Sequence, residues 1–124
     1  MRLAWVLAAA ASLGVAGCEA ATLSGTWEYE FNGNPGGYYM TLYLGAVGSA
    51  VGGTGVFGGF LGAPPDTAAV TGHRSGDSFR LTLVDRHGQV ITYAGHLAGQ
   101  NELRGTWIVA PDSTGRTVVF YRGQ

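Results

Sequence analysis

The chain has 124 residues, enough for one small domain, and only 12% of them are charged. Its seven basic residues are all arginines and face eight acids, which gives a formal net charge of −1. No basic segment is present to neutralise phosphates, so the composition excludes an ordinary nucleic-acid-binding protein. The single cysteine excludes an internal disulfide, so the packing of a core must hold the domain together.

Residues 1–17 have the pattern of an export signal. Arg2 is followed by an apolar run that is shorter than the about 20 residues of a membrane-spanning helix. The run ends in "VAGC" at Cys18, which resembles the lipobox of bacterial lipoproteins. That resemblance implies cleavage before Cys18 and attachment of acyl chains, such as palmitate, to its sulfur and its new amino group. The alternative is an ordinary secretory signal cut near Ala20, which gives a soluble periplasmic or secreted protein.

The lipobox resemblance divides the chain into three parts. These are a signal peptide over 1–17, a lipidated tether over 18–22 and a folded domain over 23–124, which the strand pattern described below predicts to be a small β-barrel. The protein is then expected in the cell envelope, with the membrane as a partner through its lipid anchor. Glu19 stands where an aspartate would resemble an inner-membrane retention signal, and this favours an outer-membrane anchor with the domain mostly in the periplasm.

The predicted elements begin just after the tether, and all of them are strands. Over residues 26–32 and 38–44, hydrophobic and other residues alternate with a period of two, and no helical period occurs in the rest of the domain. A third strand is predicted over about residues 50–57, followed by a loop rich in glycine and proline. Five more strands are predicted in segments separated by short turns: 67–74, 78–85, 89–97, 102–110 and 116–123.

Eight short strands joined by short turns predict an all-β domain. Sequential neighbours should pair antiparallel as a meander, and eight strands in this order close into an up-and-down barrel. Glycines recur inside the predicted strands, where they mark bends and close backbone approaches. They are Gly25, Gly55, Gly72, Gly95 and Gly105.

Two short features resemble the calycin superfamily, which contains lipocalins, fatty-acid-binding proteins and avidins. They are Gly25-Thr-Trp27 on the first strand and Arg122 on the last. The resemblance implies that Gly25 and Trp27 form the closed end of the barrel, with Arg122 packed over the indole. The short chain without helices is most similar to an avidin-like barrel. Biotin binding is not implied, because Tyr29 stands where avidins have an asparagine.

Secreted metalloprotease inhibitors also begin with a Leu-x-Gly-x-Trp strand, and this chain resembles them in size. Their disulfide cannot form here, since the chain has one cysteine. A similar segment, Leu103-Arg-Gly-Thr-Trp107, lies near the C-terminus, but its flanking residues differ too much for an internal duplication. Both segments are interpreted as entries of barrel strands, where glycine permits the bend and tryptophan fills the interior.

Aromatic side chains are the candidates for ligand contact. They are Trp107, Tyr39, Tyr43, Phe57 and Phe60, with the loop over 57–65 as a lid. Simple core packing is the alternative role for the same residues. We therefore keep two functions open: a non-catalytic interaction, inhibitor or assembly module with an envelope protein partner, or a barrel that binds a small hydrophobic ligand.

Enzymatic and metal chemistry find little support in the sequence. His73 and His96 each follow a strand glycine, His87 lies in a turn, and no cysteine remains as a further ligand after anchoring. Glu28 and Glu30 share one strand face, whereas a glycosidase needs carboxylates on two sides of a cleft. We therefore expect no enzyme activity, no metal and no cofactor.

Overall fold

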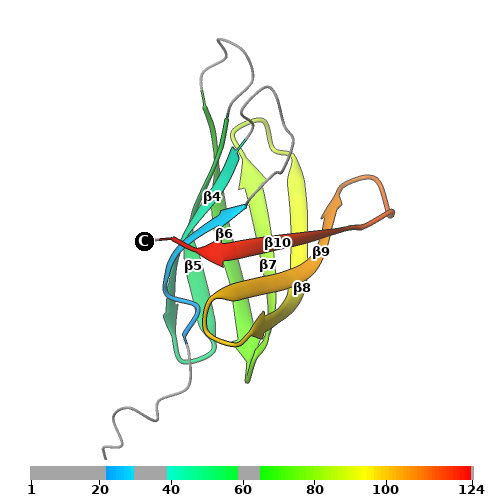
Figure 1. Ribbon diagram of the computed structural model, residues 1–124. Coiled ribbons are helices and arrows are strands. Elements are labelled where there is room, and N and C mark those ends of the chain that lie inside the picture. The colour runs from blue at the N-terminus through cyan, green and yellow to red at the C-terminus, as the bar shows by residue number, and fades with distance from the viewer. Residues whose placement is uncertain (1–21, 30–38, 59–64, 124) are drawn as a thin grey trace, which may run out of the picture.

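The computed structural model describes residues 22–29, 39–58 and 65–123, in which every regular element is a strand. Each strand pairs antiparallel with the next one, and the last returns to the first, so the sheet closes on itself (Figure 1). The prediction of an eight-stranded up-and-down barrel is therefore confirmed. The strands are β3 (Gly25–Tyr29), β4 (Tyr39–Val47), β5 (Ala50–Gly58), β6 (Asp66–Ser75), β7 (Ser78–Asp85), β8 (Val90–Ala98), β9 (Glu102–Val109) and β10 (Arg116–Arg122).

The described residues contain no helix long and apolar enough to cross a membrane.

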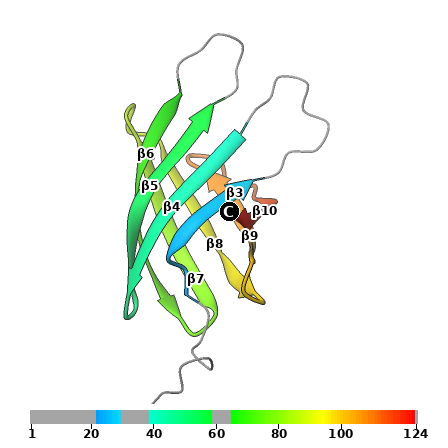
Figure 2. The same cartoon turned by 60° about the vertical axis from the view of Figure 1, so that its left-hand side comes forward.

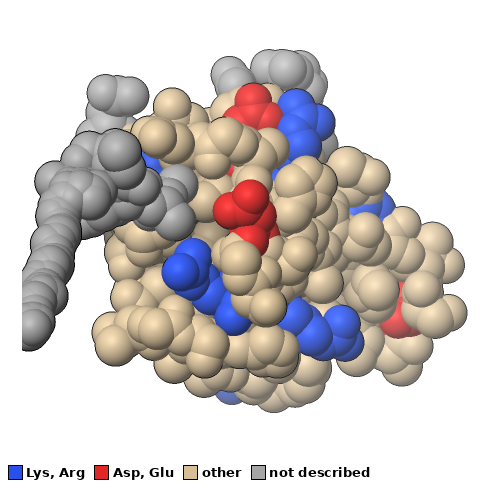
Figure 3. Space-filling model, turned by 90° about the horizontal axis from the view of Figure 1, so that it is seen from below, with Lys and Arg blue, Asp and Glu red and all other residues tan. Residues whose placement is uncertain are grey.

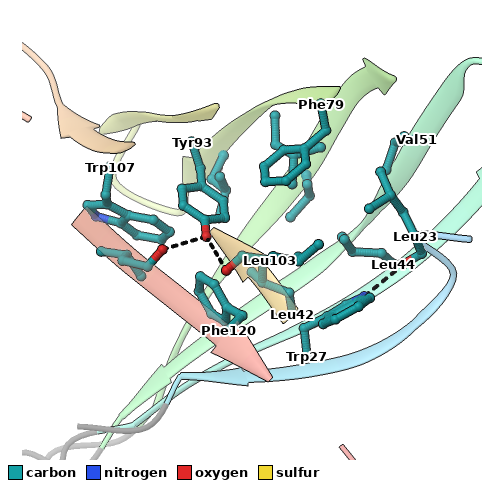
Figure 4. Close-up of a cluster of buried hydrophobic side chains, with 14 of the residues drawn as sticks. Leu23, Trp27, Leu42, Leu44, Val51, Phe79, Tyr93, Leu103, Trp107 and Phe120 are labelled. Carbon is teal, nitrogen blue, oxygen red and sulfur yellow. Dashed lines mark hydrogen bonds between the residues drawn. The ribbon is translucent and has the colours of Figure 1, made fainter. Parts of the chain in front are cut away.

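Alternation along each strand decides which side chains enter the barrel. In β4, Met40, Leu42 and Leu44 are buried, whereas Tyr39 and Tyr43 face outward. The same period operates in the other strands, because successive side chains of a strand point to opposite faces of the sheet. The largest fully buried side chains are Trp27, Tyr93 and Phe120, from three different strands, and all three point into the barrel (Figure 4).

The two ends of the barrel differ in their connections (Figure 2). We call one the closed end, formed by residues 22–24 and the tight turns 48–49, 76–77 and 99–101. Backbone hydrogen bonds join its segments: Leu97 N–H donates to Asp77 O at 2.7 Å, and Arg122 N–H donates to Asn101 O at 2.9 Å. We call the other the open end, where β3, β5, β7 and β9 finish and where residues 110–115 connect β9 to β10.

Candidate functional site

Trp27 is fully buried at the closed end. Its indole Nε1–H donates to Leu23 O at 2.9 Å, so the polar atom of the ring is satisfied (Figure 4). Arg122 covers the ring, with its Cζ 4.2 Å from the ring centre. The same guanidinium donates to the carbonyls of Thr22, Ser24 and Gln100, each at 2.9 Å. Side chains therefore close this end of the interior, and Arg122 joins it to residues 22–24 by hydrogen bonds.

The glycine of this "GTW" segment makes room for the arginine. Gly25 has φ = +134°, and a Cβ placed on it would lie 2.8 Å from Nη1 of Arg122. A side chain here would strain the backbone and displace the guanidinium. The glycine of the second "GTW" segment also has no room for a side chain. A Cβ on Gly105 would lie 2.5 Å from Ala94 O and 3.0 Å from Cε1 of Tyr93.

Tyr93 fills the middle of the barrel. Its ring centre lies 5.2 Å from that of Phe79, 5.3 Å from Phe120 and 5.6 Å from Trp107. Its hydroxyl lies 2.7 Å from Val118 O and 3.1 Å from Leu103 O, and it donates its one hydrogen to these carbonyls (Figure 4). Burial raises the pKa of Tyr93 above its ordinary value, because the phenolate would lose its hydration. Tyr93 and its three aromatic neighbours therefore fill the middle of the barrel.

A pocket of about 310 Å³ lies above the aromatic layer, at the open end. Its apolar wall combines side chains of β4, β9 and β10, and its rim adds polar groups of the β9–β10 hairpin. It is lined by Tyr29, Met40, Trp107, Val109, Asp112, Thr114, Arg116 and Val118. Trp107 is 8% exposed and marks the boundary between the packed core and this pocket.

The pocket lies beside the part of β10 that precedes its described pairing with β3. Among the described residues, β10 pairs with β3 from Phe120 to Arg122, whereas it pairs with β9 from Arg116 to Tyr121. Arg116 and Val118 share the inward face of β10, and they line the pocket together with Tyr29 of β3 and Met40 of β4.

The rim of the pocket carries one charge of each sign. In the part of the chain that the structure describes, neither Arg116 nor Asp112 forms an ion pair. Both side chains are exposed, so water hydrates them when the pocket is empty. They can therefore donate to, or accept from, polar groups of a molecule whose apolar part rests on Trp107.

The predicted contact residues fall into three groups. Trp107 lines the pocket, and Phe57 of β5 supports it from behind, with ring centres 6.1 Å apart and nearly perpendicular. Tyr39 and Tyr43 lie on the outward face of β4, 39% and 50% exposed, and are not part of the pocket. The reason is their alternation with Met40, which takes the inward face. Cys18 and Phe60 lie outside the described residues.

Sequence reasoning missed Arg116 and Asp112 as parts of the site. A signal for Arg116 was present, because it shares a period of two with Val118, Phe120 and Arg122. A charged residue at the inward position of a strand end marks the rim of a barrel. No comparable signal identified Asp112, which lies in the connection between strands.

The predicted histidine and carboxylate candidates lie on the surface in the described residues. No three histidine, cysteine, aspartate or glutamate side chains come together there as metal ligands. His73, His87 and His96 are all exposed. Glu28 is also exposed, on the outward face of β3.

Comparison with known protein families, with curated proteins and with solved structures finds no match to this chain. Its function is therefore argued from the pocket at the open end and from the chemistry around it.

Proposed function

We propose that this protein is a lipid-anchored protein of the bacterial cell envelope that binds a small amphipathic molecule at the open end of its barrel. The observation that carries the proposal is the pocket of about 310 Å³ beside the aromatic layer, with Trp107 in its lining. That volume lies near the lower limit of about 300–1,000 Å³ for small-molecule sites. The molecule bound there is therefore small.

The lining defines the chemistry of this ligand. Met40, Val109 and Val118 surround Trp107 with apolar surface, which favours a hydrocarbon or aromatic body. Arg116 and Asp112 at the rim favour polar substituents at one end of the molecule. A small amphipathic compound satisfies both parts of the pocket, whereas a fully polar compound would leave the apolar wall without a partner.

The resemblance to calycins supports the same assignment. In that superfamily a tryptophan lies across the closed end of the barrel under a basic side chain, and here Arg122 lies over Trp27. Ligands of avidin-like barrels enter at the mouth, which corresponds to the open end. The lipobox-like "VAGC" at Cys18 supports the envelope location, through acyl chains that each contribute about 0.8 kcal/mol per buried CH₂.

Uptake of a neutral environment-sensitive dye, such as N-phenylnaphthylamine, tests the binding function. We expect saturable binding at one site of the Cys18→Ser protein, with a rise in dye fluorescence. Val109→Phe places a ring in the pocket and should lower the affinity for the dye by about tenfold or more, since the ring takes up space in which the dye would contact the lining.

Val84→Phe is the matched control, because Val84 faces outward from β7 and is 40% exposed. It should bind the dye as the parent protein does. Equal affinity of Val109→Phe and Val84→Phe, or no saturable uptake by the parent, would contradict the proposal. If the dye binds as expected, native mass spectrometry of protein from envelope extracts would identify the natural ligand by its mass.

An interaction module is the second candidate, and one observation favours it. Tyr39 and Tyr43 leave large aromatic surfaces exposed on β4, and tyrosine is enriched at protein interfaces. This function predicts a crosslinked envelope protein that is lost in Tyr43→Ser and retained in Val109→Phe. The opposite pattern supports the ligand-binding barrel.

A further inference from the structure

We infer that the closed end of the barrel faces the phospholipid surface that holds the anchor, so that the pocket opens away from the membrane into water. The inference rests on the proposed lipid attachment at Cys18. It concerns a different surface from the proposed binding site and makes a separate prediction about it.

Hydrogen bonds fix the position at which the chain enters the domain. The carbonyl of Thr22 accepts a hydrogen bond from Nη2 of Arg122 at 2.9 Å, and its hydroxyl accepts one from Ser24 N–H at 3.1 Å. Ser24 is bonded in turn to Ala46, whose N–H donates to its Oγ at 2.9 Å. The N-terminal side of the domain is therefore bonded to the closed end through both Arg122 and the end of β4.

Only a short length of chain separates this position from the proposed anchor. Cys18 precedes Thr22 by four residues, and a chain of that length spans at most about 14 Å when fully extended. The acyl chains on Cys18 would lie in the bilayer, with the backbone of the cysteine at its surface. Thr22 therefore remains within about 14 Å of the headgroups, whatever conformation the tether adopts.

The closed end presents a surface of mixed character (Figure 3). Val47, at the β4–β5 turn, is 83% exposed, the highest value among the large hydrophobic side chains described. Positive and negative side chains are interspersed on the described part of this face (Figure 3). The charged residues of the turns and adjoining strand ends are Arg74, Arg80, Arg104 and Arg122 against Asp77 and Glu102.

The length of β4 sets the distance between the pocket and the closed end. Met40, which lines the pocket, and Val47 lie at opposite ends of β4, seven residues or about 23 Å of strand apart. A strand tilt of about 35–45° reduces this separation to about 18 Å along the barrel axis. The pocket therefore lies beyond the headgroup layer, and its ligand arrives from the aqueous phase instead of from the bilayer.

Fluorescence quenching in vesicles tests this orientation. The lipidated protein carries an engineered cysteine, either Val47→Cys at the closed end or His87→Cys at the open end, labelled with the same fluorophore. The sulfur of Cys18 is acylated in this protein, so the engineered thiol is the reactive one. The vesicles contain phospholipid with a nitroxide quencher on its headgroup. We expect the probe at position 47 to lose most of its fluorescence and the probe at position 87 to keep it.

Flotation of the same samples separates the possible failures. Protein that floats with the vesicles but shows equal quenching at the two positions overturns the orientation and leaves the anchor intact. Protein that does not float overturns both, whereas dye binding by the Cys18→Ser protein reports on the pocket independently.

A longer tether provides the matched control. Insertion of about 20 glycine and serine residues before Thr22 adds a mean span of about 25 Å. Quenching at position 47 should then fall towards that at position 87. Unchanged quenching would overturn the argument that the short tether holds the closed end at the membrane.

Discussion

Arg122 combines two kinds of contact that another basic residue cannot combine. Its planar face lies over the indole of Trp27, while three of its nitrogens donate to carbonyls of Thr22, Ser24 and Gln100. A lysine has a single nitrogen on a flexible stem and cannot hold this arrangement. The residue therefore joins the N-terminal segment, the β8–β9 turn and the core at one point.

Replacement of this arginine tests that role. Arg122→Lys should lower the free energy of unfolding by about 2 kcal/mol, from the weaker contact with Trp27 and the loss of two hydrogen bonds. Urea denaturation followed by tryptophan fluorescence measures the change. Arg104→Lys is the control, because Arg104 pairs with Glu102 at an exposed site and should change stability by less than about 0.5 kcal/mol. Equal effects of the two substitutions would contradict the structural role of Arg122.

Tyr93 provides a prediction of pH dependence. Burial raises its pKa in the folded state, so between about pH 10 and the higher folded value only the unfolded chain releases the proton. Stability from this group is therefore complete below about pH 10, and it falls by about 1.4 kcal/mol for each pH unit above that. At neutral pH, Tyr93→Phe should cost about 1–2 kcal/mol, because two buried carbonyls lose the hydroxyl.

The difference between wild type and Tyr93→Phe should accordingly shrink or reverse as the pH rises from about 8 to about 11.5. Urea unfolding at the two pH values measures it. The other tyrosines are present in both proteins, so their ionisation cancels in the comparison. A constant difference over this range would show that the phenol of Tyr93 ionises equally in both states.

At the scale of the elements, β9 depends on a close approach to β8. Gly105 lies opposite Gly95, and a Cβ on Gly105 would lie 2.5 Å from Ala94 O, a backbone atom that cannot move without shifting β8. The ring of Tyr93 occupies the remaining space at 3.0 Å. The strand therefore bends inward at this residue because it has no side chain there.

Gly105→Ala should therefore destabilise the protein by about 1–3 kcal/mol, as overpacking in a core does. Gly45→Ala is the matched control on β4, since a Cβ there meets nothing within 4 Å. It should be neutral or should stabilise by about 0.5–1 kcal/mol, because alanine has less backbone freedom to lose. Thermal melts of the two variants measure the contrast, and a harmless Gly105→Ala would mean that β8 and β9 are farther apart.

The elements also show what the sequence can predict. Alternation identifies the inward residues of each strand separately, such as Met40 and Leu42, and short turns dictate which strands are neighbours. The fold class followed from these local rules. How far the interior is filled depends on side chains from different strands, such as Tyr93 and Phe120, and their distance is not a local property. The pocket was therefore beyond sequence reasoning. Trp107, predicted as a ligand contact, lines the pocket, and its contact with a ligand stays a prediction.

At the scale of the whole molecule, we expect the location of the protein to depend on Cys18, which lies outside the barrel. Cys18→Ser removes the proposed site of acylation, and we expect the protein to move from the membrane fraction to the soluble periplasmic fraction. Cell fractionation with an antibody against the domain measures this. A wild-type protein that is already soluble would favour cleavage near Ala20 and would contradict the anchor.

The pairing of β10 with β3 also has a consequence for folding kinetics. Arg122 and Ser24 are 98 residues apart in the chain, yet they share a hydrogen bond. A barrel closed by such distant segments has a high contact order, so we expect it to fold in milliseconds to seconds rather than microseconds. Until β10 is added, β3 and β9 each present an unpaired edge, which is a template for pairing with another chain. Self-association is therefore a hazard of the incomplete chain, and the last strand removes it.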